Sequence, residues 1–285
     1  MVSMRPAAAC AAFLLPLLAA APAFAQQSGT DSPPDLDRDS IMVGVGAAVV
    51  PSYEGSDNSV ITAVPGVRGR VSGINFTVRG NRAWADLIPT PGGPGWDFQA
   101  GPVVNINLNR TSRIEDRQVS ALGKIKAAAE LGGFVGIGKQ GVLTSDYDKL
   151  TVSVAYVHDV GDIHKSYVVT PSIDYGTPLS RKAYVGINAS ADYVGDGYAQ
   201  TYFGVTPAGS LRSGLPVYSA GKGWKDWGVT GYANVALTGD LTHGLSAIGG
   251  VGYSRLLNDA ADSPIVRIAG SRNQLYGLLG IAYTF

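Results

Sequence analysis

The stretch Leu275-Tyr-Gly-Leu-Leu-Gly-Ile-Ala-Tyr-Thr-Phe285 decides the fold of this chain. Its residues alternate in character, because one face carries the apolar or aromatic set Leu275, Gly277, Leu279, Ile281, Tyr283 and Phe285. The other face carries residues that are mostly smaller or more polar. A period of two predicts a β-strand with two different faces. Such a strand would promote aggregation in a soluble protein, but it is typical of a closed barrel in lipid.

The same alternation recurs along the chain and predicts twelve strands. In the stretch 96–109, for example, Trp96 and Phe98 share a face opposite Asp97 and Gln99. The expected strands are 41–50, 60–70, 73–79, 83–88, 96–109, 123–137, 150–158, 164–175, 182–194, 226–238, 244–257 and 273–285. Many are near the ~9–11 residues that cross a bilayer at a tilt. We therefore expect an all-β protein whose residues 41–285 form a transmembrane antiparallel β-barrel of about 12 strands.

An even number of strands places both ends of a barrel chain on one side, which is the periplasm in bacterial barrels. The loops expected on the outer side are 51–59, 80–82, 110–122, 159–163, 195–225 and 258–272. Those expected on the periplasmic side are 71–72, 89–95, 138–149, 176–181 and 239–243. The stretch 138–149 is long for a periplasmic turn. Pro102 and Pro171 are awkward within strands because each removes a ladder donor, which a bulge could accommodate.

Residues 1–25 are typical of a secretory signal peptide. An apolar run from Ala11 to Ala23 follows the single charge of Arg5, and Ala23-Phe24-Ala25 resembles a cleavage site. The run is shorter than the ~20 residues of a spanning helix, which argues against a membrane anchor. Residues 26–40 are polar and contain Pro33-Pro34, so we expect a flexible periplasmic lead-in. We accordingly expect export through the general secretion pathway.

The composition excludes several function classes. The formal net charge is zero, which gives no electrostatic basis for binding nucleic acid. The only cysteine, Cys10, lies in the expected signal peptide, so the exported chain has no thiol or disulfide chemistry. A soluble β-sandwich or lipocalin-like barrel with an inward apolar face is the alternative fold. Charges on the smaller-residue faces favour a wet lumen instead: Arg68, Arg70, Arg79, Lys124, Lys126 and Glu130.

No stretch carries a specific catalytic or metal-binding pattern. Acids flank His158 and His164, but neighbouring residues on a strand point to opposite faces, and no Gly-x-Ser-x-Gly elbow is present. The third histidine, His243, has no such neighbour. An oxygen-rich calcium site is one reading of Glu54, Asp57, Asp259 and Asp262, and simple turn chemistry is the other. We expect no catalytic residue, no cofactor and no metal site.

The segment from Tyr198 to Trp227 is rich in aromatic residues, which are unusual in a disordered loop. We expect it to fold over or into the mouth of the barrel. There it would close a pore, present a binding surface, or simply pack on itself.

Six short segments at these loops and at the end of the chain resemble the MipA/OmpV family of outer-membrane proteins. They are Tyr53–Asp57, Gly101–Val103, Tyr202–Thr206, Ser213–Leu215, Asp259–Ile265 and Tyr283–Phe285. The resemblance covers about residues 40–285 and implies a barrel in the Gram-negative outer membrane. The namesake of the family is described as a scaffold that links a lytic murein transglycosylase to a murein polymerase. The resemblance also implies that Phe285 is read by the barrel-assembly machinery.

Three functions follow as expectations. The first is a non-enzymatic envelope scaffold in the lipid of the outer membrane. The second is a small solute channel with a narrow polar lumen, in which Glu130, Asp174 and Asp192 would balance the row Arg68, Arg70, Arg79, Lys124 and Lys126. The third is a lipid hydrolase that uses His158 or His164, and we rank it last.

Overall fold

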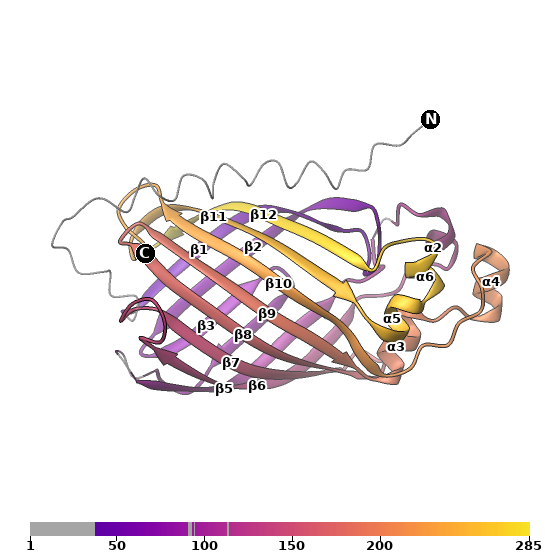
Figure 1. Ribbon diagram of the computed structural model, residues 1–285, viewed down its shortest axis with the longest axis horizontal. Coiled ribbons are helices and arrows are strands. Elements are labelled where there is room, and N and C mark those ends of the chain that lie inside the picture. Colours follow the sequence, from indigo (N-terminus) through magenta and orange to yellow (C-terminus); the bar gives the residue numbers. More distant parts are fainter. Residues whose placement is uncertain (1–37, 91–92, 94, 113) are drawn as a thin grey trace.

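The computed structural model describes residues 38–285 apart from 91, 92, 94 and 113, so the expected signal peptide and most of the lead-in lie outside the described residues. The described chain forms a closed barrel of antiparallel strands (Figure 1). The strands are β1 (Ser40–Pro51), β2 (Ser59–Val71), β3 (Ile74–Arg79), β4 (Arg82–Asp86), β5 (Trp96–Asn107), β6 (Ala128–Gln140), β7 (Lys149–Asp159), β8 (Tyr167–Ser180), β9 (Ala183–Val194), β10 (Gly223–Ala236), β11 (Gly244–Leu256) and β12 (Asn273–Thr284). The twelve expected strands are confirmed.

The barrel closes between its first and last strands. Met42 on β1 is in register with Thr284 on β12, and the Phe285 N–H donates to the Ile41 carbonyl at 2.9 Å. Every other strand pairs with its neighbours in sequence. The start of β1 and the end of β12 therefore lie at one end of the barrel, as expected for an even number of strands. We call this the terminal end. The helices lie at the opposite end, which we call the helical end (Figure 1).

The two faces of the wall differ as the alternation predicts. On β12, Leu275, Leu279 and Ile281 point outward and remain 45 to 54 % exposed, whereas the inward Ala282 and Thr284 are buried. Outward aromatic residues gather at both ends. At the helical end they are Tyr156, Tyr167, Tyr193, Trp224, Trp227 and Tyr253, and at the terminal end Trp96, Phe98, Tyr283 and Phe285. Two aromatic girdles around an apolar band match the two interfaces of a membrane.

A membrane-crossing helix would need a long apolar run. Among the described residues, no helix has both the length and the apolar character to cross a membrane.

Inward tyrosines cover inward glycines along the middle of the wall. The rings of Tyr184 and Tyr232 lie directly over Gly176 and Gly186, where a side chain would collide with them. The two rings stack with centroids 6.4 Å apart, and the Tyr232 hydroxyl donates to Asp174 at 3.0 Å. Aromatic cover of this kind fills the space that a strand glycine leaves open. The tyrosines therefore narrow the lumen in its middle.

Both strand prolines keep their register, so neither is accommodated by a bulge. No register shift is present at Pro102 or Pro171. Beside Pro102 the β4–β5 ladder is interrupted, and the Asp86 carboxylate accepts the N–H of Ala100 at 3.0 Å. Each proline thus lies where the ladder is interrupted on one side. The long turn expected at 138–149 is present at the terminal end, because β6 ends at Gln140 and β7 begins at Lys149.

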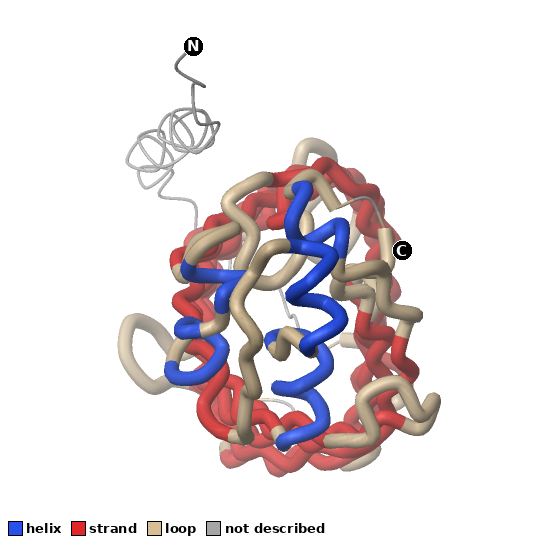
Figure 2. Tube along the Cα trace, turned by 90° about the vertical axis from the view of Figure 1, so that its right-hand side faces the viewer, coloured by secondary structure: helices blue, strands red, loops and turns tan. Residues whose placement is uncertain are grey.

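Within the described residues, five short helices cover the helical end of the barrel. They are α2 (Arg117–Ala121), α3 (Asp196–Phe203), α4 (Pro207–Ser213), α5 (Asn258–Asp262) and α6 (Pro264–Arg267). Seen along the barrel from this end, helices and loops cross the mouth (Figure 2). Local capping defines α4: the Thr206 hydroxyl accepts the N–H of Gly209, Pro207 occupies the first turn, and Gly214 ends the helix at a φ of 72°.

Candidate functional site

We call residues 195–222 the plug, because their first helix, α3, packs into the helical end of the barrel. Four residues of α3 are buried: Tyr198, Ala199, Tyr202 and Phe203, none more than 2 % exposed. They belong to one apolar cluster with inward residues of β5, β7, β8, β9 and β11, namely Val103, Ala155, Val157, Val168, Val194 and Leu256. Strands from most of the circumference thus pack around one helix. The expectation that the Tyr198–Trp227 segment folds over or into the mouth is confirmed up to residue 222, and its last residues belong to β10.

A second apolar layer lies further out and seals the plug. It combines Tyr53, Ile114, Val119, Val205, Leu215, Ile265 and Ala269, from loops after β1, β5, β9 and β11. The Tyr53 hydroxyl donates to the Ala269 carbonyl at 2.6 Å, and the Ser263 hydroxyl donates to the Phe203 carbonyl at 2.6 Å. Burial, and then the nearby carboxylate of Asp116, raise the pKa of Tyr53 well above its usual range. The phenol therefore stays neutral and acts as a donor.

Lys225 is the centre of a buried ionic group under the plug. Its Nζ atom lies 2.7 Å from Glu54 Oε1, 3.2 Å from Asp192 Oδ2 and 3.3 Å from Asp226 Oδ2, and its side chain is only 4 % exposed. A buried ammonium needs such compensation, because leaving water costs a charge several kcal/mol. The Tyr198 hydroxyl also donates to Glu54, at 2.9 Å from Oε2. The plug is thereby connected to the barrel wall through Glu54.

A break in the strand register explains why two charged neighbours point the same way. The β9–β10 register shifts between Trp224 and Asp226. Trp224 and Trp227 point outward, while Lys225 is buried and Asp226 is in register with the inward Asp192. A β-bulge re-aims a side chain in this manner. The bulge therefore supplies both a cation and an anion to the lumen.

A second buried ionic group lies beside the first. The Nε2 atom of His164 is 3.0 Å from Glu130 Oε1, and both side chains are at most 2 % exposed. The amides of Asn105 and Asn107 donate to the same carboxylate at 2.6 and 3.1 Å. The His164 ring also packs edge-on against Tyr198, with centroids 5.1 Å apart. Glu130 thus connects β5 and β6 to the loop after β7.

Asp159 holds the loop that carries His164. Its carboxylate accepts the N–H groups of Gly161, His164 and Lys165 at 2.7 to 3.0 Å. These hydrogen bonds fix the loop in the conformation that presents His164 to Glu130. We call Glu54, Glu130, His164, Asp192, Tyr198, Lys225 and Asp226 together the lumen cluster.

A polar cavity of about 150 Å³ lies beside the lumen cluster. Its lining residues are Glu54, Asn81, Arg82, Asn105, Asn107, Glu130, Val157, Val168, Thr170, Asp192, Tyr198 and Lys225. This volume is far above the roughly 10–15 Å³ that one water needs. The lining combines three carboxylates, two cations and several amides, so the cavity suits a small polar group with charges of both signs.

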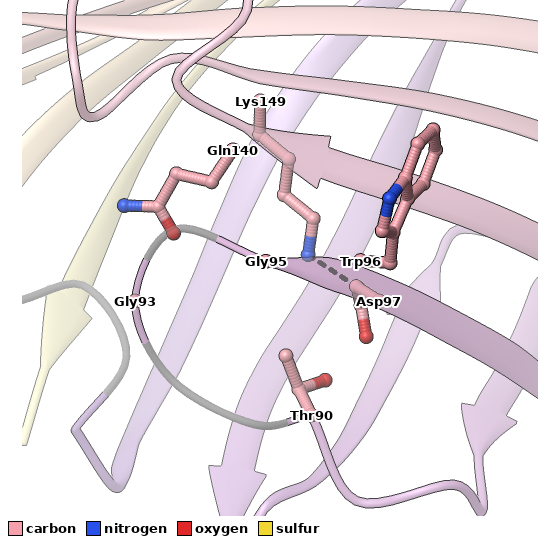
Figure 3. A pocket seen from close by; sticks show the side chains of 7 residues that line it. All are labelled: Thr90, Gly93, Gly95, Trp96, Asp97, Gln140 and Lys149. Carbon is pink, nitrogen blue, oxygen red and sulfur yellow. Dashed lines mark hydrogen bonds and ion pairs between the residues drawn. The ribbon is translucent and has the colours of Figure 1, made fainter.

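A much smaller pocket lies at the terminal end (Figure 3). Lys149 reaches across it, and its Nζ atom lies 2.6 Å from Asp97 Oδ2. The cavity measures only about 10 Å³, which is room for no more than a water. We therefore treat this pocket as part of the wall and the cavity at the lumen cluster as the candidate site.

The expected inward row of cations is correct only in part. The three arginines, Arg68, Arg70 and Arg79, belong to the inward face. Arg68 is in register with Met42, Arg70 with Asn75, and Arg79 with Arg82. Lys124 and Lys126 do not face the lumen, because β6 begins only at Ala128 and both side chains are exposed in the loop before it. The alternation continues past the end of the strand, which is why the sequence misleads there.

The histidines do not form the catalytic arrangement that a lipid hydrolase would need. His158 is exposed on the outer face of β7, whereas Asp159 is buried on the inner face, as the alternation predicts. His243 is exposed in a turn at the terminal end, with its ring centroid 5.9 Å from that of Tyr283. Within the described residues, no serine hydroxyl forms a hydrogen bond with a histidine ring.

The acidic residues considered as a calcium site do not converge on one point. Glu54 pairs with Lys225, Asp259 accepts the N–H of Gly221 at 2.7 Å, and Asp262 lies 4.0 Å from Arg272. The part of the chain that the structure describes holds no group of three or more potential metal ligands. Turn chemistry is the reading that these contacts favour.

Sequence reasoning missed Lys225 and the roles of Glu54 and Glu130 around it. One signal was present, because two adjacent charged residues between Trp224 and Trp227 break the period of two. Such a break marks a bulge. The contacts of Glu54 and His164 left no comparable signal, because both lie in loops that meet only in the folded chain.

Known proteins share this architecture. The chain is similar in fold to the NanC porin (7% identity, TM-score 0.45, covering 85% of this chain and 98% of that one). It is also similar to an outer membrane channel from Pseudomonas putida F1 (12% identity, TM-score 0.44, 90% and 100%) and to the translocator domain of autotransporter NalP from Neisseria meningitidis (12% identity, TM-score 0.38, 98% and 97%). No curated protein sequence matches the chain.

The sequence profile of one family, described as MltA-interacting protein MipA, matches residues 43–285. The match begins within β1 and extends to Phe285, and so includes the wall, the plug and the lumen cluster. The resemblance of the loop motifs is thereby confirmed, and the chain belongs to the MipA family of outer-membrane β-barrel proteins.

Proposed function

We propose that this protein is a non-enzymatic docking protein of the outer membrane. Its barrel is held closed at the helical end, and its terminal end binds murein-processing enzymes in the periplasm. The observation that carries the proposal is the packing of α3, whose Tyr202 and Phe203 are at most 1 % exposed inside the barrel. A pathway for solutes would need open space where these side chains lie.

The ionic contacts under the plug support the same reading. The lumen cluster fixes the plug from several strands at once, through Lys225, Glu130 and His164. Breaking such a buried pair leaves an uncompensated charge, which typically costs about 3–5 kcal/mol. A plug held in this way is a permanent part of the fold rather than a gate that opens spontaneously.

The terminal end offers a surface for a partner at residues 141–148, which we call the docking loop. The Asp148 carboxylate accepts the backbone N–H groups of Val142, Leu143 and Thr144, and the Tyr175 hydroxyl donates to it at 2.9 Å. The loop is therefore rigid, yet Leu143 and Tyr147 remain 70 % and 42 % exposed. A preorganised loop loses little entropy on binding, and exposed apolar residues supply contact area.

The class of partner comes from the family description, which names an interaction with MltA. The namesake of the family is described as a link between a lytic murein transglycosylase and a murein polymerase. We propose both classes as partners of the docking loop. Export through the general secretion pathway after removal of residues 1–25 belongs to the same proposal, and N-terminal sequencing of the exported chain tests it.

Binding of a purified lytic murein transglycosylase to the immobilised full barrel tests the proposal. We expect saturable binding that Leu143→Ser weakens, because the change removes the most exposed apolar side chain of the docking loop. Leu211→Ser is the matched control, because Leu211 is 90 % exposed on α4 at the opposite end. No binding by the unaltered barrel, or equal losses in both variants, would contradict the proposal.

A further inference from the structure

The barrel wall has a gap above the β3–β4 hairpin. The hairpin ends at Gly80 and Asn81, where the Gly80 N–H donates to the Pro65 carbonyl at 2.9 Å and the Asn81 carbonyl accepts the N–H of Ile106 at 2.8 Å. On one side of this tip, β2 continues beyond Pro65 to Ser59. Within the described residues, no strand pairs with that side of residues 59–64. The gap therefore lies between residues 59–64 of β2 and the end of β5.

The edge of β2 leaves backbone groups open at the gap. The Pro65 carbonyl points toward the hairpin, and backbone groups alternate in direction along a strand. The N–H and C=O groups of Ser59, Ile61 and Ala63 therefore point into the gap. Ile61 is 77 % exposed, which agrees with a missing neighbour on this side.

The gap opens toward the hydrocarbon of the membrane. Outward apolar side chains flank it on both sides: Ile61 and Ala63 on β2, and Ile106 and Leu108 at the end of β5. Bare backbone groups at this depth cost several kcal/mol each, so open sheet edges are not left facing lipid tails. A polar group must therefore reach the edge from the gap.

The candidate cavity lies directly behind the gap. Its lining runs from the hairpin turn at Asn81 and Arg82 through β5 to β10, and returns to Glu54 after β1. None of the lining residues that the structure describes belongs to β2 or β3. The side of the cavity without a wall is thus the side on which β2 stands alone.

We propose that the gap is a lateral entrance for one zwitterionic phospholipid. Its head group occupies the cavity and its acyl chains remain between β2 and β5, in contact with Ile61 and Ile106. A head group that enters through the gap also brings polar atoms within reach of the open edge of β2. This site is independent of the docking loop at the other end.

The lining selects a head group with both charges. The Arg82 guanidinium makes no hydrogen bond within the described chain, so its donors are available to a phosphate, which they match in geometry. Glu54 and Asp192 keep 31 % and 27 % of their side chains exposed although both contact Lys225. They can therefore accept a lipid ammonium in addition. Three carboxylates against two cations disfavour a head group that is only anionic.

Lipid retention by the full barrel tests the proposal. The protein is reconstituted in nanodiscs with equal amounts of phosphatidylethanolamine and phosphatidylglycerol of identical acyl chains, transferred to mild detergent, and examined by native mass spectrometry. We expect one retained phosphatidylethanolamine per barrel, preferred about tenfold, which is the effect of one charge-assisted hydrogen bond. Arg82→Gln should lower retention of either lipid.

A pair of variants separates a lipid from a free head group. Ala63→Trp places a large ring at the rim of the gap, and Ala47→Trp makes the same change at its register partner on β1, where β12 completes the wall. We expect Ala63→Trp to lose the lipid and Ala47→Trp to keep it, with both variants folded by heat-modifiable gel mobility. Equal retention in both variants, no retained lipid, or a mass equal to two copies of the chain would overturn the proposal.

Discussion

The two ends of the barrel are built from the same alternating strands but treat charge differently. At the helical end, the almost completely buried Lys225 pairs with Glu54, and the equally buried His164 pairs with Glu130. At the terminal end, the ion pairs are partly solvated, with Lys149 and Arg181 36 % and 46 % exposed. Buried pairs are expensive to break, whereas exposed pairs contribute little. The difference supports the proposal that the helical end stays closed while the terminal end meets partners.

The largest effect that we expect concerns assembly at the terminal end. Deleting Phe285 removes a ring that is 65 % exposed and packs 4.7 Å from the Tyr283 ring, centroid to centroid. It also removes the last backbone contact between β12 and β1. We expect little folded barrel in the outer membrane, measured by gel mobility of membrane fractions. Phe285→Tyr keeps the aromatic ring and should assemble; equal assembly of all three chains would refute a signal role for Phe285.

The next largest effect concerns the plug. Lys225→Met leaves Glu54, Asp192 and Asp226 without their shared cation. We expect a loss of about 3–5 kcal/mol in the free energy of unfolding. Urea unfolding of the detergent-folded barrel measures it, together with faster proteolysis within residues 195–222. Lys222→Met, at an exposed position of the plug, is the control, and comparable losses in both would remove the distinction between the two ends.

A smaller loss should follow from a change at Glu130. Glu130→Gln removes the charge that accepts hydrogen bonds from His164, Asn105 and Asn107. We expect a loss of about 1–3 kcal/mol in the free energy of unfolding, because buried donors lose a charged acceptor. Thermal unfolding measures the loss against Asp57→Asn, which changes an exposed carboxylate at the same end. A loss no greater than that of the control would show that Glu130 is not part of the plug's support.

At the terminal end, the docking loop should depend on pH through Asp148. Burial raises the pKa of Asp148, but the N–H groups of Thr144, Val142 and Leu143 lower it by more, so the pKa lies well below its usual range. The stabilisation of the docking loop by ionised Asp148 is then fully present above pH 4, the ordinary pKa of an aspartate being about 4. It is lost as pH falls below that value. Amide signals of Val142 and Leu143 should report this loss, and Asp148→Asn should disturb them at every pH. Signals that change near neutral pH would contradict the assignment.

The smallest effect should come from Asp240 in the turn after β10. The Thr242 hydroxyl is the main cause that lowers the pKa of Asp240 to about 2, with further help from Arg181. Its contribution is present above pH 4 and is lost as the pH falls toward 2. Because the pair with Arg181 is largely exposed, we expect Asp240→Asn to cost less than about 1 kcal/mol in urea unfolding. A loss as large as that of Lys225→Met would erase the contrast between the two ends.

The wall could be predicted from the sequence because a period of two reports a strand directly. Leu275 to Phe285 and eleven further segments have the same pattern, and each is a strand of the barrel. The ends of strands are less certain from the pattern. Lys124 and Lys126 continue the alternation beyond Ala128, where the strand actually begins, and so lie in a loop rather than in the lumen.

The lumen cluster could be predicted only in part. Its wall residues Glu130 and Asp192 lie on faces that the alternation assigns correctly. Lys225 is inward only because of a bulge, and Glu54 and His164 reach it from loops whose path depends on the packing of α3. Contacts between loops distant in sequence carry no periodic signal. The plug and its place at the barrel mouth could be expected from its aromatic content, but the strand residues against which α3 packs could not.

Planar-bilayer recording of the purified full barrel tests the central claim most directly, with Lys225→Met recorded beside it. The plug account predicts no unitary conductance from the unaltered protein, because α3 packs into the helical end of the barrel and the lumen cluster holds it there. It predicts intermittent conductance from Lys225→Met, in which the plug loses its central cation. Steady unitary steps from the unaltered protein would contradict the account and would establish a channel instead.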